Sequence, residues 1–126
     1  MVKKAEPYPQ RVLDLMAEKS AILFKAHAFA DMDMAQAALP LWASAANYEE
    51  RLAPLLEGLG RHREAALHRI SAASCYQKVG DLSRAANLYR AALAGSLPEE
   101  TQREVQQMLT ACLVELSRLT LGASVA

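Results

Sequence analysis

The chain has 126 residues, of which 52% are hydrophobic and 22% charged, and its 14 basic and 14 acidic side chains give a formal net charge of zero. This length and composition predict one soluble globular domain over residues 1–126 and exclude an intrinsically disordered chain. Because the charges balance, no overall field attracts nucleic acid or an anionic membrane, and we expect neither as a partner.

The first residues and the two cysteines bear on the location of the protein. The start, MVKKAEPYPQ, has no apolar segment behind its lysines, so no secretory signal is expected. No run approaches the roughly 18 apolar residues of a transmembrane helix. Cys75 and Cys112 lack C-x-x-C spacing, which favours two buried thiols in a reduced, cytoplasmic protein over a disulfide.

Glycine and proline divide the chain into five segments. Each segment is predicted to be a helix, because alanine is abundant and no segment alternates apolar and polar residues as a strand does. The first helix is expected at about 9–30. The acidic break at 31–33 is expected to supply an N-cap for the second helix, at about 34–59. Pro40 and Pro54 lie inside this second helix and predict a kink or an interruption.

Three more helices are predicted at about 61–79, at about 81–94 and from the phrase SLPEE onward, where Ser96 and Glu99 suit a capping box. The last helix carries an amphipathic stripe formed by Val105, Leu109, Cys112, Leu116 and Leu119. Residues 1–8 and 120–126 are expected to be flexible ends. The predicted fold class is all-α.

One phrase occurs twice in the chain, twenty residues apart. Gly60 is followed by the pair Ala65 and Ala66, and Gly80 is followed at the same spacing by Ala85 and Ala86. Glycine permits a tight turn with positive φ, which we predict for Gly80, and small alanines then let the next helix approach its neighbour closely. This pattern is typical of stacked antiparallel helical hairpins.

These residues resemble the tetratricopeptide repeat (TPR) family. Residues 66–99 form one 34-residue unit whose small, aromatic and glycine positions are occupied by Ala73, Tyr76, Gly80, Ala85, Tyr89 and Ala92. The stretch DMAQAALPLWASA is similar to a second helix of such a unit, with Trp42 at a packing position. The run GRHREAALHRISAASCYQKVGDLSRAANLYRAAL is more specifically similar to the repeats of soluble NSF-attachment (SNAP) proteins.

The resemblance implies a TPR-like right-handed stack of about five antiparallel helices that serves as a non-catalytic protein–protein interaction module. A groove between hairpins would accept a partner segment, without a cofactor. The chain holds only about two hairpins and a terminal helix, so a role in SNARE disassembly is not carried over. The lysine and asparagine of carboxylate-gripping TPR modules are replaced here by Leu23, His27, Ile70, Ser71 and Ser74. Gln77 and Lys78 are the candidate partner-binding residues, although their interpretation as solvated turn residues is favoured over a ligand contact.

A second interpretation comes from RHREAALH, where Arg61, Arg63 and His68 satisfy an R-x4-6-H pattern similar to that of HEPN-type ribonucleases. The arginine would stabilise a phosphate and the histidine would act as a general base. Arg63 and His68 align poorly on one helical face, whereas Arg61 and His68 align better. Solvated arginines and a histidine at the edge of a packed face explain the same residues, so we predict no catalysis. No metal is expected, because His68 and Cys75 lie about 10 Å apart along a helix.

The last predicted helix has more apolar residues than one stripe can bury. Val114 and Leu121 fall outside the stripe, and little charge accompanies them beyond Glu115 and Arg118. Exposed apolar patches of this kind usually mark an interface. We therefore expect a homodimer, or a state bound to a partner, through Val114 and Leu121.

Overall fold

The computed structural model describes residues 8–125, and every regular element in this range is an α-helix. The helices are α1 (Gln10–Asp31), α2 (Ala35–Gly58), α3 (His62–Lys78), α4 (Leu82–Leu93) and α5 (Glu99–Val125). The predicted all-α class and the five helices are confirmed. Residues 1–7, most of the amino-terminal segment predicted to be flexible, lie outside the described residues, as does Ala126. At the other end, α5 continues through residues 120–125.

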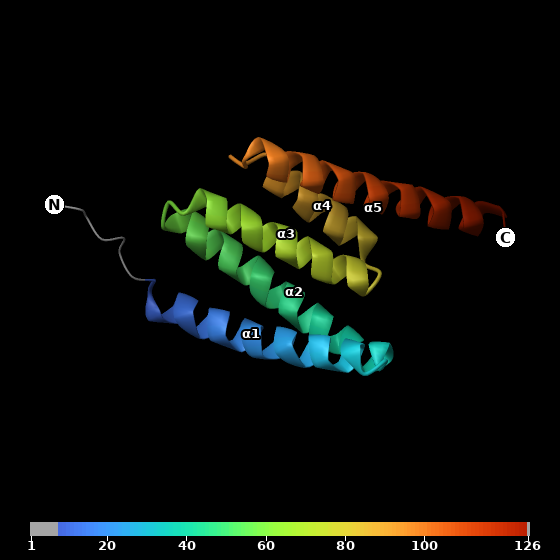
Figure 1. The fold of residues 1–126 in the computed structure, drawn as a ribbon. Helices are drawn as coiled ribbons and strands as arrows, with labels where there is room; N and C mark the ends of the chain where they lie inside the picture. Colours follow the sequence, from blue (N-terminus) through green and yellow to red (C-terminus); the bar gives the residue numbers. More distant parts are fainter. Residues whose placement is uncertain (1–7, 126) are drawn as a thin grey trace.

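Consecutive helices pack against one another, α1 on α2, α2 on α3, α3 on α4 and α4 on α5. Short turns reverse the chain between them, so that neighbours run antiparallel (Figure 1). In this view α1, α3 and α5 form the front layer, and α2 and α4 lie behind them. None of the helices in the described part of the chain is long and apolar enough to cross a membrane.

The same turn closes three of the helices. Gly60 and Gly80 have φ of +76° and +85°, which confirms the prediction for Gly80. After α3, the N–H of Gly80 donates to the carbonyl of Gln77 at 3.2 Å and the N–H of Asp81 donates to that of Tyr76 at 2.9 Å. This pair of bonds is a Schellman motif, and the turn around Gly60 repeats it. The repeated phrase of the sequence therefore encodes a repeated helix end.

The turn after α1 uses the same motif with an aspartate in place of glycine. Asp33 has φ of +58°, and the N–H of Met34 donates to the carbonyl of Phe29 at 2.8 Å. The prediction that the acidic break caps α2 is wrong, because the N-cap of α2 is Met34, which makes no side-chain capping bond. Asp33 instead supplies the left-handed residue that ends α1, a conformation that aspartate tolerates better than most residues.

Of the kink or interruption predicted at Pro40 and Pro54, the interruption is wrong, because α2 continues from residue 35 to residue 58. Both prolines are exposed, while packing of α2 against α1 and α3 holds the helix together and offsets the lost backbone bonds. The capping box at Ser96 does not form either, since Pro98 accepts the first bond of α5, from the N–H of Gln102 at 2.9 Å.

Small residues and two tyrosines dominate the core. The paired alanines after Gly60 and Gly80 are all buried, and Tyr76 and Tyr89 fill the space beside them. Cys75 and Cys112 are free thiols inside the larger of two core clusters, which confirms their predicted packing role. The smaller cluster joins the start of α1 to the end of α2 and consists of Val12, Leu15, Leu52, Ala53, Leu56 and Ala65.

Candidate functional site

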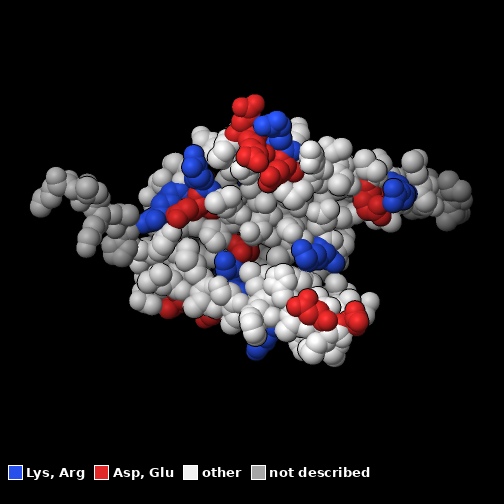
Figure 2. Space-filling view, viewed as in Figure 1, with Lys and Arg blue, Asp and Glu red and all other residues white. Residues whose placement is uncertain are grey.

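A cleft of about 280 Å³ lies between α1 and α3, with α2 as its floor. Figure 2 shows this hollow in the front face, with acidic and basic atoms recessed between the two helices. Each of the three helices contributes to the lining, which consists of Leu23, His27, Trp42, Glu49, Ser71, Ser74, Cys75 and Lys78. The cleft therefore combines the apolar side chains of Leu23 and Trp42 with carboxylate, hydroxyl, imidazole and ammonium groups.

Trp42 forms the floor at one end of the cleft. Its side chain is buried, as predicted, and the ring of His27 meets it edge-on with centroids 4.8 Å apart. The ammonium of Lys78 lies 5.0 Å from the centroid of the Trp42 ring and donates to Ser74 Oγ at 3.2 Å. Cation–π and edge-on ring contacts of this kind hold both polar groups at the mouth of the cleft.

Glu49 forms the floor at the other end, and it is the buried charged residue of the core, with 2% of its surface exposed. Lys19 of α1 lies 3.4 Å from its Oε1, and Nδ1 of His68 in α3 is hydrogen-bonded to its Oε2. A buried carboxylate needs such partners, because desolvating an unpaired charge is costly. The cluster joins α1, α2 and α3 in the floor of the cleft.

Sequence reasoning missed Glu49, because the phrase NYEERL looks like a solvated helix face. The available signal was its position seven residues after Trp42, which places both residues on the buried face of α2.

Cys75 lines the cleft in surroundings that disfavour its thiolate form. Burial raises the pKa of its thiol, and the nearby carboxylate of Glu49 raises it as well, while Lys78 and Lys19 oppose the shift. A thiol with a raised pKa stays protonated near neutral pH and is a poor nucleophile.

The predicted partner-binding residues lie in three different places. Lys78 lines the cleft. Gln77 faces α4 instead, where its Oε1 accepts a hydrogen bond at 2.8 Å from Tyr89, whose pKa is raised by burial to about 12. Val114 and Leu121 are exposed on the last helix.

Most of the residues that stand in place of the carboxylate clamp of TPR modules lie in the cleft. Leu23, His27, Ser71 and Ser74 line the cleft, while Ile70 packs against the core.

Two residues of the R-x4-6-H pattern, Arg61 and His68, bind to different carboxylates. Arg61 pairs with Glu64 at 3.4 Å, and its guanidinium lies 4.1 Å from the centroid of the Tyr8 ring. His68 is bound to the buried Glu49, and Arg63 is exposed. The structure thus shows separate partners for the arginine and the histidine.

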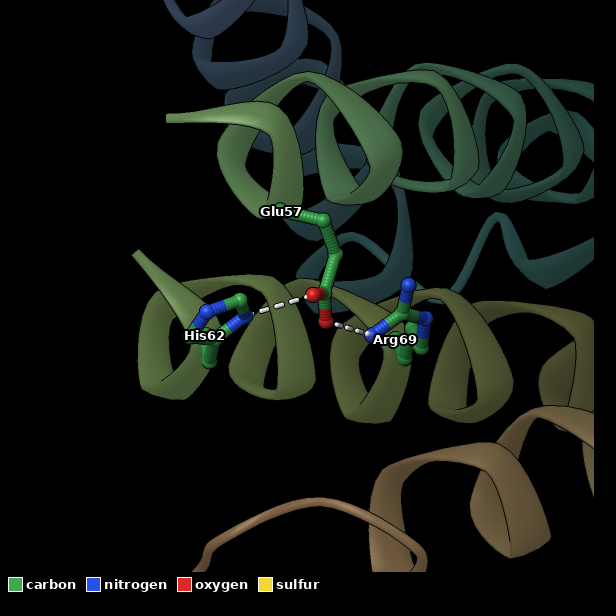
Figure 3. Close-up of polar contacts among 3 residues, drawn as sticks. All are labelled: Glu57, His62 and Arg69. Atoms are coloured by element: carbon green, nitrogen blue, oxygen red, sulfur yellow. Dashed lines mark hydrogen bonds and ion pairs between the residues drawn. The ribbon is translucent and has the colours of Figure 1, made fainter. Parts of the chain in front are cut away.

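A further polar cluster joins the end of α2 to the start of α3. Figure 3 shows Glu57 between His62 and Arg69, with its oxygens 2.6 Å from Nδ1 of His62 and 2.9 Å from Nη1 of Arg69. Hydrogen bonds from Arg69 and then from His62 lower the pKa of the Glu57 carboxyl. Within residues 8–125, no group of three or more His, Cys, Asp or Glu side chains is arranged to hold a metal ion.

No protein-family profile, no characterised protein and no solved structure matches the chain.

Proposed function

We propose that the chain is a non-catalytic protein–protein interaction module of TPR-like or SNAP-like type, which binds a segment of a partner protein in the cleft between α1 and α3. Antiparallel helices packed in sequence, with the same turn repeated twenty residues apart, support a stack of helical hairpins. The two buried free thiols fit a cytoplasmic location.

The charges in the cleft support this proposal, because its acidic group has partners of opposite charge whereas its basic group has no ion pair among the described residues. Glu49 is paired with Lys19 and His68, so the acidic group of the cleft is already satisfied. Lys78 forms no ion pair with a carboxylate among the described residues, and its ammonium is held at the mouth of the cleft. Leu23 and Trp42 supply apolar surface beside it.

This arrangement favours a segment that carries an apolar side chain next to an acidic one. The apolar side chain would pack on Leu23 and Trp42, and the carboxylate would pair with Lys78. Ser71 and Ser74 supply hydroxyl groups that can bond to the backbone of the segment.

Peptide display against the wild-type protein tests the proposal. Selected peptides are measured again with Ser71→Arg, which fills the mouth of the cleft, and with Ser83→Arg, the same change at an exposed position of α4. We expect Ser71→Arg to weaken binding at least tenfold and Ser83→Arg to bind as the wild type does. Lys78→Glu should remove the preference for acidic peptides.

Two results contradict the proposal. One is a wild-type protein that selects no peptide. The other is a set of peptides that bind Ser71→Arg as tightly as they bind the wild type.

A further inference from the structure

Several hydrogen-bond donors of the cleft gather at its Trp42 end. The ammonium of Lys78 lies 5.0 Å from the centroid of the Trp42 ring, and the centre of the His27 imidazole lies 4.8 Å from it. Ser74 Oγ accepts a hydrogen bond from Lys78, so the proton of this hydroxyl can point into the cleft. Side chains from two walls, α1 and α3, can therefore donate to one ligand at this end.

These donors have few partners inside the molecule. Within residues 8–125, Lys78 forms no ion pair and the side chain of His27 forms no hydrogen bond. Ser71 lies one turn before Ser74 on the same face of α3, and its hydroxyl has no hydrogen bond in this range either. A hollow lined by such donors suits an acceptor that comes from outside the chain.

The charges of the cleft show that this acceptor is an anion. The carboxylate of Glu49, at the other end, is neutralised by Lys19 at 3.4 Å. Lys78 has no such counter-charge, since Asp31 and Asp33, at the end of α1, are exposed and form no ion pair with it. The donors therefore lie where positive charge is in excess, which attracts a negatively charged group.

We propose that this end of the cleft binds the phosphate of a phosphoserine or phosphothreonine in the partner segment, in preference to an unmodified acidic side chain. The inference rests on the proposed function, because it names the acidic group that would pair with Lys78. A phosphate ester carries a charge of about −1.5 to −2 and three acceptor oxygens, whereas a carboxylate carries one charge and two oxygens. Ammonium, imidazole and hydroxyl donors on two walls suit three tetrahedral oxygens better than two in one plane.

The cleft also has room for a phosphorylated side chain. Its volume of 280 Å³ is about nine times the roughly 30 Å³ that a water molecule occupies in the liquid. The carbon atoms of the phosphorylated residue would pack on Leu23 and Trp42, which line the same space.

Calorimetry with one peptide in three forms tests the inference. The peptide is one that display selects for the cleft, and its acidic position carries glutamate, phosphoserine or serine. We expect the phosphoserine form to bind at least tenfold more tightly than the glutamate form, and the serine form to bind most weakly.

Two lysine variants assign this preference to the cleft. Lys78→Gln should remove the advantage of the phosphoserine form. Lys25→Gln makes the same change of charge at an exposed position of α1 outside the cleft and should preserve the advantage. Equal losses in the two variants would reveal a general charge effect and overturn the inference.

An NMR titration of the full chain needs no selected peptide. We expect O-phosphoserine to shift the ring signals of His27 and Trp42 saturably, with a dissociation constant in the millimolar range, and glutamate to shift them less. The absence of saturable shifts at about 50 millimolar O-phosphoserine overturns the inference. Inorganic phosphate that binds as tightly as the phosphoserine peptide also overturns it, because the site would then serve the free ion.

The calorimetry separates failure of this inference from failure of the proposed function. Equal affinity of the glutamate and phosphoserine forms, both weakened by Ser71→Arg, overturns the inference and leaves the proposed function standing. Affinities that Ser71→Arg leaves unchanged in every form contradict both.

Discussion

The buried carboxylate of Glu49 offers the sharpest test of how the cleft is held together. Glu49→Gln keeps the size of the side chain and removes its charge. At 3.4 Å from Lys19, the attraction is about 5 kcal/mol at an effective dielectric constant of 20. Lys19 keeps 17% of its surface exposed and can still reach water, which offsets part of this loss. We therefore expect a net destabilisation of about 2–4 kcal/mol.

Urea unfolding and thermal melting, both followed by circular dichroism, measure this loss. For a chain of this length it corresponds to a fall in Tm of about 10 °C. The matched control is Glu115→Gln, whose ion pair with Arg118 is exposed on both sides and should be worth under about 1 kcal/mol. Equal effects of the two substitutions would refute the reasoning. Lys19→Met combined with Glu49→Gln should cost less than the two single changes added together.

Three further predictions concern the turns, the polar cluster and the absence of catalysis. Gly80→Ala should destabilise by about 1–2 kcal/mol and Asp33→Gly should stabilise by about 0.5–1 kcal/mol in urea unfolding, because both positions have positive φ. The pKa of Glu57 is lowered in the fold, so its contribution to stability is present above the unfolded pKa and is lost as pH falls through the folded one. Carbon-detected NMR should show an acid-shifted midpoint for Glu57 that moves up in Arg69→Gln, and an unmoved midpoint contradicts the pairing. Purified protein should leave single-stranded RNA intact, and cleavage that His68→Ala abolishes would show that the chain is an enzyme.

Local signals in the sequence were enough to predict the helices and most of their ends. Gly60 and Gly80 marked the turns because a left-handed residue is usually glycine. Asp33 fills the same role without that signature, so it was misread as a cap for the next helix. Pro40 and Pro54 were misread because the packing of α2 on two neighbours, which keeps it continuous, depends on contacts distant in sequence.

The candidate site was predictable only in part. The TPR resemblance placed Leu23, His27, Ile70, Ser71 and Ser74 on one inner face, and all of these except Ile70 line the cleft. Glu49 was missed because its partners come from two other helices, and no local pattern joins them.

The exposed end of α5 was predictable only in part as well. Val114 and Leu121 were expected to stay exposed, as they do. Leu119 was expected to share the buried stripe and is exposed instead, because α4 is too short to cover it.

Fluorescence of Trp42 tests the central claim, that the cleft between α1 and α3 binds a partner segment, most directly. Trp42 is the only tryptophan in the chain, and it lies in the floor of the cleft. Titration with a selected acidic–apolar peptide should change its emission saturably, with the dissociation constant that calorimetry gives for the same peptide. Ser71→Arg should abolish the change and Ser83→Arg should preserve it. Tight binding by calorimetry with constant Trp42 emission, unaffected by Ser71→Arg, would place the site elsewhere and contradict the account.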